Sequence, residues 1–363
     1  MFKRVEYLYF LLAFAAALLV GCSADSNDSA AQGSSKNRIV DTMALSKNKP
    51  VQKGPLKVLR VGWVYAMANA PIIIAQHKGY FAAQGLKVEL KSYTSGPQVK
   101  RDLKSGYLDV AYIGAPPVYH WYSKGLKSKI IAKVNYGQAA VIVHRSSKIR
   151  KVKDLRNKRM AGVKIGSGMD VLLRGYIIKE KGLMNPKKDL NIIPMKPAKM
   201  GAAIENKEVS GAFSWEPFTS KYLLRGKTRI IVDVHKDFPR YPWYVVMAMP
   251  NAIKNKRREL VKLLKAHKKA VKYLNSSPTA GNGIIVKAFG LKAVVDTNGK
   301  KHAASEILKL AKTRLGWQAR LTYRDTRFMQ KLMNYSYRLG YIKKPLNAED
   351  IIDIDFLYRA SLN

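Results

Sequence analysis

Regular alternation of short apolar strands with helices is the feature that most restricts the fold of this 363-residue chain. The pattern begins at Leu56 and continues to Met249. Such alternation predicts an α/β fold with mainly parallel sheets. The predicted strands cover residues 56–64, 86–90, 108–113, 129–134, 139–143, 160–165, 190–194, 210–215 and 228–234. The predicted helices cover residues 71–78, 98–104, 169–181, 199–206 and 217–224, and most of the chain after residue 249.

The turns that lead from these strands into the helices are rich in glycine, serine and aromatic residues. In open sheets of this kind, ligands bind beyond the carboxyl ends of the strands. Glycine lets a ligand approach the backbone, and the free N–H groups at a helix start favour anions. Helix capping explains each turn taken singly, so the turns form a site only if several meet at one cleft. They span residues 64–71, 93–97, 112–117, 165–169 and 214–217.

The first 21 residues have the pattern of a bacterial lipoprotein signal peptide. Lys3 and Arg4 precede an apolar run that ends at Val20, which is shorter than a membrane-spanning helix needs. The run leads into Leu19-Val20-Gly21-Cys22, which resembles a lipobox and contains the only cysteine of the chain. We therefore expect Cys22 to carry lipid and to anchor the protein to a membrane, on the periplasmic side of the cell envelope. An ordinary signal peptide that happens to contain a cysteine is the alternative.

Residues 22–54 are rich in small and polar residues without periodicity, which predicts a flexible tether. A single cysteine excludes a disulfide framework and a multi-thiolate metal site, and no metal or cofactor is expected. The sequence contains no legible Ser–His–Asp or paired-carboxylate pattern, so its residues do not predict an enzyme.

The charge is strongly basic, with 66 Lys and Arg against 24 Asp and Glu and a net charge of +42. This balance favours anionic partners. No nucleic-acid-binding motif is present, so nucleic acid is not an expected partner, although a basic surface-binding or nucleic-acid-binding lipoprotein stays an alternative. The basic helix predicted over residues 254–275 has an apolar stripe that should pack inward, formed by Leu260, Leu264, His267, Val271 and Leu274.

Six short elements follow one another in a recognisable order: His77-Lys78-Gly79-Tyr80-Phe81, Gln84-Gly85-Leu86, Ser105-Gly106-Tyr107-Leu108-Asp109-Val110, Val152-Lys153-Asp154-Leu155, Gly166-Ser167 and Trp215-Glu216-Pro217. Together they resemble the substrate-binding proteins of the nitrate/sulfonate/taurine (NMT1-like) family of ABC importers, across about residues 56 to 278. Gln84 departs from the acidic residue that is usual in this family. Residues 291–363 form a helical tail without a match in the pattern; within it, Asn298-Gly299 predicts a tight turn.

The resemblance implies a two-lobed periplasmic-binding fold of type II, with two α/β lobes, two crossover segments and a cleft between the lobes. Lobe one would comprise residues 56–141 and 247–363, and lobe two residues 142–246. Ala139–Val143 and Tyr244–Met249 would be the crossovers. The implied partners are a small solute and the permease and ATPase subunits of an ABC importer, and the protein would act as a monomer.

The resemblance also places the ligand at the strand-to-helix turns. The residues expected to bind it are Tyr65, Asn69, Gly114, Ala115, Ser167, Gly168, Met169, Trp215, Glu216 and Trp243. Backbone N–H groups near Ser167 would hold an oxyanion, aromatic residues would form walls, and Glu216 would pair with a ligand amine. This set favours a small anion or zwitterion such as a taurine-like aminosulfonate. A thiamine-pyrimidine-binding protein is one alternative, and a thiamine-pyrimidine-synthase-like enzyme, which would carry a cysteine-rich motif, is another.

Overall fold

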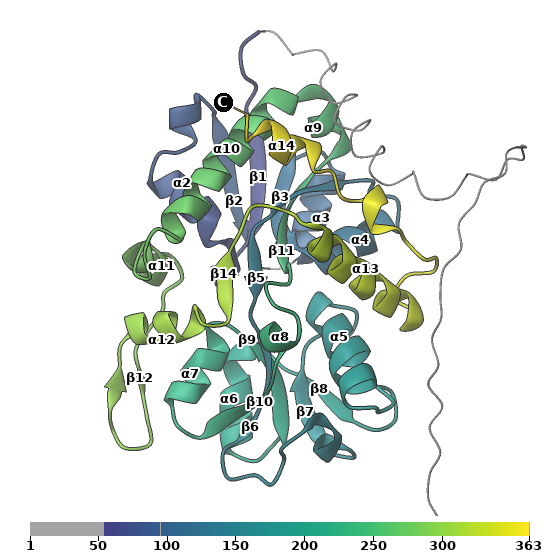
Figure 1. The fold of residues 1–363 in the computed structure, drawn as a ribbon, viewed down its shortest axis with the longest axis vertical. Coiled ribbons are helices and arrows are strands. Elements are labelled where there is room, and N and C mark those ends of the chain that lie inside the picture. The colour runs from purple at the N-terminus through teal and green to yellow at the C-terminus, as the bar shows by residue number, and fades with distance from the viewer. Residues whose placement is uncertain (1–53, 95, 363) are drawn as a thin grey trace, which may run out of the picture. The chain divides into compact units, whose positions relative to one another are not determined.

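Two five-stranded sheets organise the part of the chain that the computed structural model describes, residues 54–94 and 96–362 (Figure 1). The predicted signal peptide, Cys22 and nearly all of the predicted tether lie outside the described residues. The first sheet has the order β2 (Val88–Tyr93), β1 (Leu59–Val64), β3 (Val110–Gly114), β11 (Tyr244–Ala248) and β4 (Lys129–Lys133). Strands β2, β1 and β3 are parallel, whereas β11 runs antiparallel to both β3 and β4.

The second sheet has the order β10 (Thr228–Asp233), β6 (Ala139–His144), β9 (Gly211–Trp215), β7 (Arg159–Gly162) and β8 (Asn191–Pro194). Strands β9, β7 and β8 are parallel, and β6 runs antiparallel to both β9 and β10. One strand in each sheet runs antiparallel to both of its neighbours: β11 in the first sheet and β6 in the second. In both cases it is the first strand of that sheet that the chain forms after leaving the other sheet. The predicted α/β class is confirmed, with sheets that are mixed.

Helices connect the parallel strands, as the alternation predicts. They are α2 (Ala70–His77), α3 (Gly96–Lys104), α4 (Ala115–Tyr122), α5 (Gly168–Leu172) with its π-helical continuation η4 (Leu173–Lys181), α6 (Pro197–Glu205) and α7 (Phe218–Leu224). Short 3₁₀ turns are η1 (Met67–Asn69), η2 (Ala82–Gln84) and η3 (Val152–Leu155). Pro71, Pro116 and Pro197 occupy the first turns of α2, α4 and α6, where a missing N–H group costs no hydrogen bond.

The connections between the two sheets differ from the predicted crossovers. The runs Ala139–Val143 and Tyr244–Met249 lie inside the sheets, as strands β6 and β11. The connections are residues 134–138, which contain β5 (Asn135–Gly137), and residues 234–243, which contain α8 (Val234–Asp237). The two runs are apolar because they are central strands covered on both faces, not because they cross between lobes. The lobe boundaries predicted at residues 141 and 246 therefore move to the starts of β6 and β11.

The C-terminal region begins with α9 (Pro250–Asn255), α10 (Arg257–Leu274) and α11 (Asn282–Ala288). All five residues of the predicted stripe on α10 are buried, so the basic face of this helix is its outer face, as predicted. Strands β12 (Val294–Val295) and β13 (Lys301–His302) then pair as a hairpin, and Asn298-Gly299 lies in its turn, also as predicted. The chain continues through α12 (Ala304–Ala311), β14 (Leu315–Trp317), α13 (Tyr323–Arg338), η5 (Ala348–Asp350) and α14 (Asp355–Arg359).

The C-terminal region does not belong to lobe one alone, which corrects the predicted assignment of residues 247–363. Here lobe one means the first sheet with its helices, and lobe two the second sheet with α5, η4, α6 and α7. Helix α12 packs against α7 of lobe two, and β14 pairs with β5 of the first connection. Helix α13 contacts α4 of lobe one on one side and α5 and η4 of lobe two on the other. Residues 304–338 therefore join the two lobes (Figure 1).

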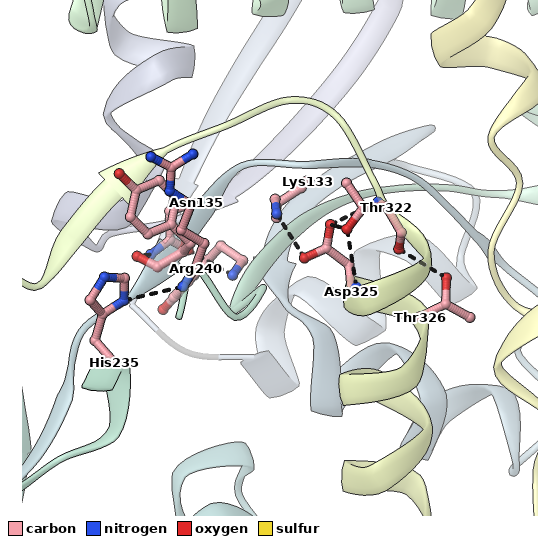
Figure 2. A network of polar contacts seen from close by, with 9 residues as sticks. Lys133, Asn135, His235, Arg240, Thr322, Asp325 and Thr326 are labelled. Carbon is pink, nitrogen blue, oxygen red and sulfur yellow. Dashed lines mark hydrogen bonds and ion pairs between the residues drawn. The ribbon is translucent and has the colours of Figure 1, made fainter. Parts of the chain in front are cut away.

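A buried ion pair fixes the start of α13 to lobe one (Figure 2). Lys133 Nζ donates to Asp325 Oδ1 at 2.7 Å, and both side chains are nearly inaccessible to solvent. The other carboxylate oxygen, Oδ2, accepts hydrogen bonds from the backbone N–H and the hydroxyl of Thr322, which caps the helix. Burial lowers the pKa of Lys133, and the neighbouring Asp325 carboxylate opposes that shift.

Removing one member of this pair should destabilise the fold. Asp325→Ala leaves the Lys133 ammonium buried without its counter-ion, and we expect the free energy of unfolding in urea to fall by about 3–5 kcal/mol. The double variant Lys133→Met with Asp325→Asn should recover part of this loss, because it leaves no buried charge and keeps an oxygen at the helix cap. A loss below about 1 kcal/mol in Asp325→Ala would show that the pair contributes little.

Acid should destabilise the protein partly through His267. This side chain is fully buried, its Nε2 lies 3.0 Å from the Lys133 carbonyl oxygen, and burial lowers its pKa to about 4. An unfolded histidine has a pKa near 6.5, so the unfolded chain binds the extra proton as the pH falls from 6.5 towards 4. We expect this group to remove about 2–3 kcal/mol of stability between pH 7 and pH 4.5.

The measurement is the free energy of unfolding at both pH values in the parent protein and in His267→Gln, which keeps an N–H donor but does not titrate. The difference between the two pH values should be smaller in His267→Gln. His120, whose pKa burial also lowers to about 4, titrates in both proteins and so serves as an internal reference. Equal pH dependence in the two proteins would contradict the assignment to His267.

Candidate functional site

A cavity of about 230 Å³ lies where the carboxyl ends of strands from both sheets meet. Lobe one contributes Val64 at the end of β1, Gly96 at the start of α3, and four residues around the start of α4, which are Ile113, Gly114, Pro116 and Pro117. Lobe two contributes Val163 after β7, the turn at residues 167–169, and Trp215 at the end of β9. Trp243, at the end of the second connection, and Tyr244, the first residue of β11, complete the lining. The turns singled out in the sequence therefore do meet at one place.

The turn before α5 is built to present backbone N–H groups. Ser167 caps the helix, because its Oγ accepts a hydrogen bond from the N–H group of Asp170 at 3.3 Å. The buried Asp170 carboxylate in turn accepts from the Gly166 N–H group at 2.9 Å and from Arg174 Nε at 2.7 Å. The N–H groups of Gly168 and Met169 belong to the first helical turn and have no acceptor within the helix. This turn can donate to an anionic oxygen.

Aromatic side chains form much of the cavity wall. Trp215, Trp243 and Tyr244 all line it. The Trp243 backbone is held in place because its carbonyl oxygen accepts from the Ala115 N–H group at 2.8 Å. Burial raises the pKa of Tyr244 to about 12, so its hydroxyl stays protonated and can donate a hydrogen bond at neutral pH.

The lobe-one wall is poor in donors and touches lobe two directly. Pro116 and Pro117 have no N–H group, so the start of α4 cannot bind an anion in the way that the start of α5 can. Pro116 packs against Gly168, and a Cβ built at Gly168 would lie only 2.7 Å from Pro116 Cγ. Glycine at residue 168 is thus required for the two walls to come this close.

Six of the ten predicted binding residues line the cavity: Gly114, Ser167, Gly168, Met169, Trp215 and Trp243. Three others form the structure around it. Tyr65 is half-exposed, stacks near Phe289 and donates from its hydroxyl to the Ala288 carbonyl oxygen at 2.9 Å. Asn69 is buried and donates from its amide to the carbonyl oxygens of Val64 and Tyr112.

Ala115 is the third of these residues. It is buried, and its N–H group is used by Trp243. The Tyr65, Asn69 and Ala115 side chains therefore lie outside the cavity lining, and their role is to shape the turns.

Glu216 has a different partner from the ligand amine predicted for it. Its Oε1 accepts from Arg314 Nε at 2.6 Å, and its Oε2 accepts from the Ser220 N–H group at 3.1 Å. Arg314 also donates to Ser220 Oγ at 2.9 Å, and both charged side chains are buried. The prediction is revised because a guanidinium group of the chain, 98 residues away in sequence, already neutralises this carboxylate.

Sequence reasoning missed several cavity residues, notably Val64, Val163 and Tyr244. Val64 ends β1 and adjoins the named Tyr65, and Val163 follows the end of β7, four residues before the named Ser167. Tyr244 adjoins the named Trp243. These residues could have been found from their positions at the ends of strands or next to a named residue. For lining such a cavity, position at the carboxyl end of a strand matters more than the polarity of the side chain.

Two sheets, two connections and a cavity lined from both sheets define a two-lobed protein of the periplasmic-binding fold. The chain belongs to the NMT1-like family, whose model matches residues 52–289. The resemblance drawn from the six sequence elements is therefore confirmed.

Several of the similar proteins are named as binding proteins. A putative aliphatic sulfonates-binding protein from Bacillus subtilis (strain 168) is 25% identical over 313 residues, which cover 84% of this chain and 88% of the relative. The periplasmic aliphatic sulphonate binding protein SsuA from Escherichia coli has a similar structure, with a TM-score of 0.68, 20% identity, and coverage of 83% of this chain and 92% of that one. The periplasmic nitrate-binding protein NrtA from Synechocystis PCC 6803 gives a TM-score of 0.65, 17% identity, and coverage of 84% and 88%. The two structures, at these identities, establish the fold and not the ligand.

Two further properties concern only residues 54–94 and 96–362. No cluster of three or more histidine, cysteine, aspartate or glutamate side chains there is arranged to hold a metal ion. No helix in this part of the chain combines the length and the hydropathy needed to cross a bilayer.

Substituting Gly168 should hold the two cavity walls apart. In Gly168→Val the added side chain meets Pro116, so water should reach Trp215 and Trp243 more easily. We expect tryptophan emission to shift to longer wavelength and to be quenched more strongly by acrylamide. Gly283→Val is the matched control, because no atom lies within 4 Å of a Cβ built at that helical glycine. Identical spectra for the two variants would contradict the direct contact across the cavity.

Proposed function

We propose that this protein is an extracytoplasmic solute-binding lipoprotein of an ABC importer, which captures a small sulfonate-like anion between its lobes and delivers it to a membrane permease. The observation that carries the proposal is the meeting of the turns from both lobes at one cavity, with the N–H groups of Gly168 and Met169 at one end and tryptophan rings along its walls. The family and the sulfonate-binding relative support it.

The cavity chemistry suits an anion with an apolar tail. The start of α5 offers N–H donors to an oxyanion, and charge-assisted hydrogen bonds of this kind contribute about 1.5–3 kcal/mol each. Among the described residues, none that lines the cavity carries a formal charge. Its other walls, including Val64, Ile113 and Met169, are apolar. An alkyl chain of a few carbons would fill the roughly 230 Å³ better than the compact nitrate ion.

An amine on the ligand has no evident partner. Arg314 pairs with the carboxylate of Glu216, and no acidic residue lines the cavity among the described residues. Burying an ammonium group without a counter-ion is costly. The proposed ligand is therefore an alkylsulfonate without an amine, in place of the taurine-like zwitterion that the sequence favours.

Anchoring and delivery complete the proposal. Lipid on Cys22 would hold the protein at the membrane, and residues 23–54 would let the described part of the chain reach a permease and its ATPase. The lipobox-like sequence supports the first point, and the family supports the second.

Calorimetry with pure ligands tests the ligand class. We expect hexanesulfonate to bind at least tenfold more tightly than taurine or nitrate. Trp215→Ala should weaken hexanesulfonate binding by roughly tenfold to a hundredfold, because it removes a large apolar wall worth about 1.5–3 kcal/mol. Tyr107→Ala, which removes a half-exposed aromatic residue that does not line the cavity, should bind as the parent protein does.

Two results would contradict the proposal. Tighter binding of taurine than of hexanesulfonate would show that the amine is recognised despite the Arg314–Glu216 pair. Binding of a thiamine-type pyrimidine, without binding of any sulfonate, would replace the ligand class and leave the fold assignment intact.

A further inference from the structure

A second and larger cavity, of about 470 Å³, lies on the second connection between the lobes. Its floor is formed by Phe238 and Tyr241, which follow α8, and by Phe328 of α13. Tyr323, Arg324 and Arg327, from the first turns of α13, form its rim. None of these residues lines the cavity between the lobes, so the two cavities are distinct.

The floor is a rigid set of aromatic rings. The Tyr241 and Phe328 ring centroids lie 5.0 Å apart, and those of Phe238 and Phe328 lie 5.2 Å apart with the planes at 65°. Tyr241 and Phe328 are buried, while Phe238 is only partly covered. Rings held in this way offer faces and edges against which another aromatic ring can pack.

The acidic residues at this cavity are already paired with cations that come from elsewhere. Asp237 accepts from Lys181 Nζ at 2.9 Å, and Asp325 accepts from the buried Lys133 at 2.7 Å (Figure 2). The remaining lysine at the cavity, Lys331, pairs with Glu180 at 2.8 Å. The acids therefore do not neutralise the rim.

Arg324 and Arg327 are the two other positively charged residues that line this cavity. Both side chains are exposed, and neither forms an ion pair with another residue in the described part of the chain. The Arg327 guanidinium group stacks 5.9 Å from the centroid of the exposed Tyr323 ring. Two guanidinium groups beside an aromatic floor match a planar ligand that carries one carboxylate or sulfonate group.

We propose that this cavity is a second binding site, for a small aromatic monoanion. The ring of the ligand packs on Phe238, Tyr241 and Phe328, and its anionic group is held by Arg324 and Arg327. The cavity has about twice the volume of the one between the lobes, so a two-ring ligand fits it. Because its walls belong to the second connection and to α13, a bound ligand also contacts two of the three segments that join the lobes.

Calorimetry with 2-naphthoate as the probe tests the site in the purified protein. We expect saturable binding of one molecule, and at least tenfold weaker binding in the double variant Arg324→Gln with Arg327→Gln. The matched control is Lys343→Gln with Lys344→Gln, which removes the same charge from exposed residues that line neither cavity. Its affinity should stay within twofold of the parent value. The neutral analogue 2-naphthol should bind at least tenfold more weakly than 2-naphthoate.

A cleft variant separates this site from the cavity between the lobes. Trp215→Ala should bind 2-naphthoate with unchanged affinity, because Trp215 lines only the other cavity. The proposal is overturned if the parent protein shows no saturable binding, or if Trp215→Ala weakens binding while the arginine variant does not. Equal losses in the arginine and lysine variants would also overturn it, since they would show an effect of net charge alone.

Discussion

The direct packing of Gly168 against Pro116 is the contact on which the cavity between the lobes depends. It brings the start of α5 against the start of α4, and so sets how near the carboxyl ends of the two sheets come to one another. The two walls of the resulting cavity differ in the backbone N–H donors that they offer. Lobe two supplies the first N–H groups of α5, whereas the two prolines of α4 give lobe one an apolar wall. In the proposed binding mode, the anionic group of the ligand points towards lobe two, and its apolar tail points towards lobe one, Trp215 and Trp243.

The ion pair between Arg314 and Glu216 shows that the chain itself supplies the counter-ion for the buried Glu216 carboxylate. A carboxylate this deeply buried requires a cation, and the sequence elements around Trp215 give no sign that the cation comes from the protein. With Arg314 in place, Glu216 positions the start of α7 through the Ser220 N–H group and is not available to a ligand. In the proposed binding mode, selectivity depends on hydrogen-bond donors and shape, because none of the described residues that line the cavity is charged.

Much of the fold follows from sequence because its determinants are local. The alternation of apolar runs with helix signals located the strands that build both sheets to within a few residues, and the spacing of Leu260, Leu264 and His267 identified the buried face of α10. The lobe boundaries did not follow, since a central strand and an apolar crossover have the same composition. The partner of Glu216 could not follow either, because Arg314 is 98 residues distant and nothing near it marks the pairing.

The C-terminal region shows most clearly what local pattern leaves out. Arg314 binds lobe two, the next residues pair with the first connection through β14, Asp325 binds Lys133 of lobe one, and Lys331 returns to lobe two. Each of these contacts joins residues far apart in sequence, so none leaves a periodic signal. These contacts restrict how one lobe can rotate against the other. Any rotation of one lobe against the other must carry β14 along with β5 or break their pairing, and it must also change the packing of α13 on both lobes. The two covalent connections are therefore not the only segments that control how the lobes move, and the helical tail that the family pattern does not match is a third.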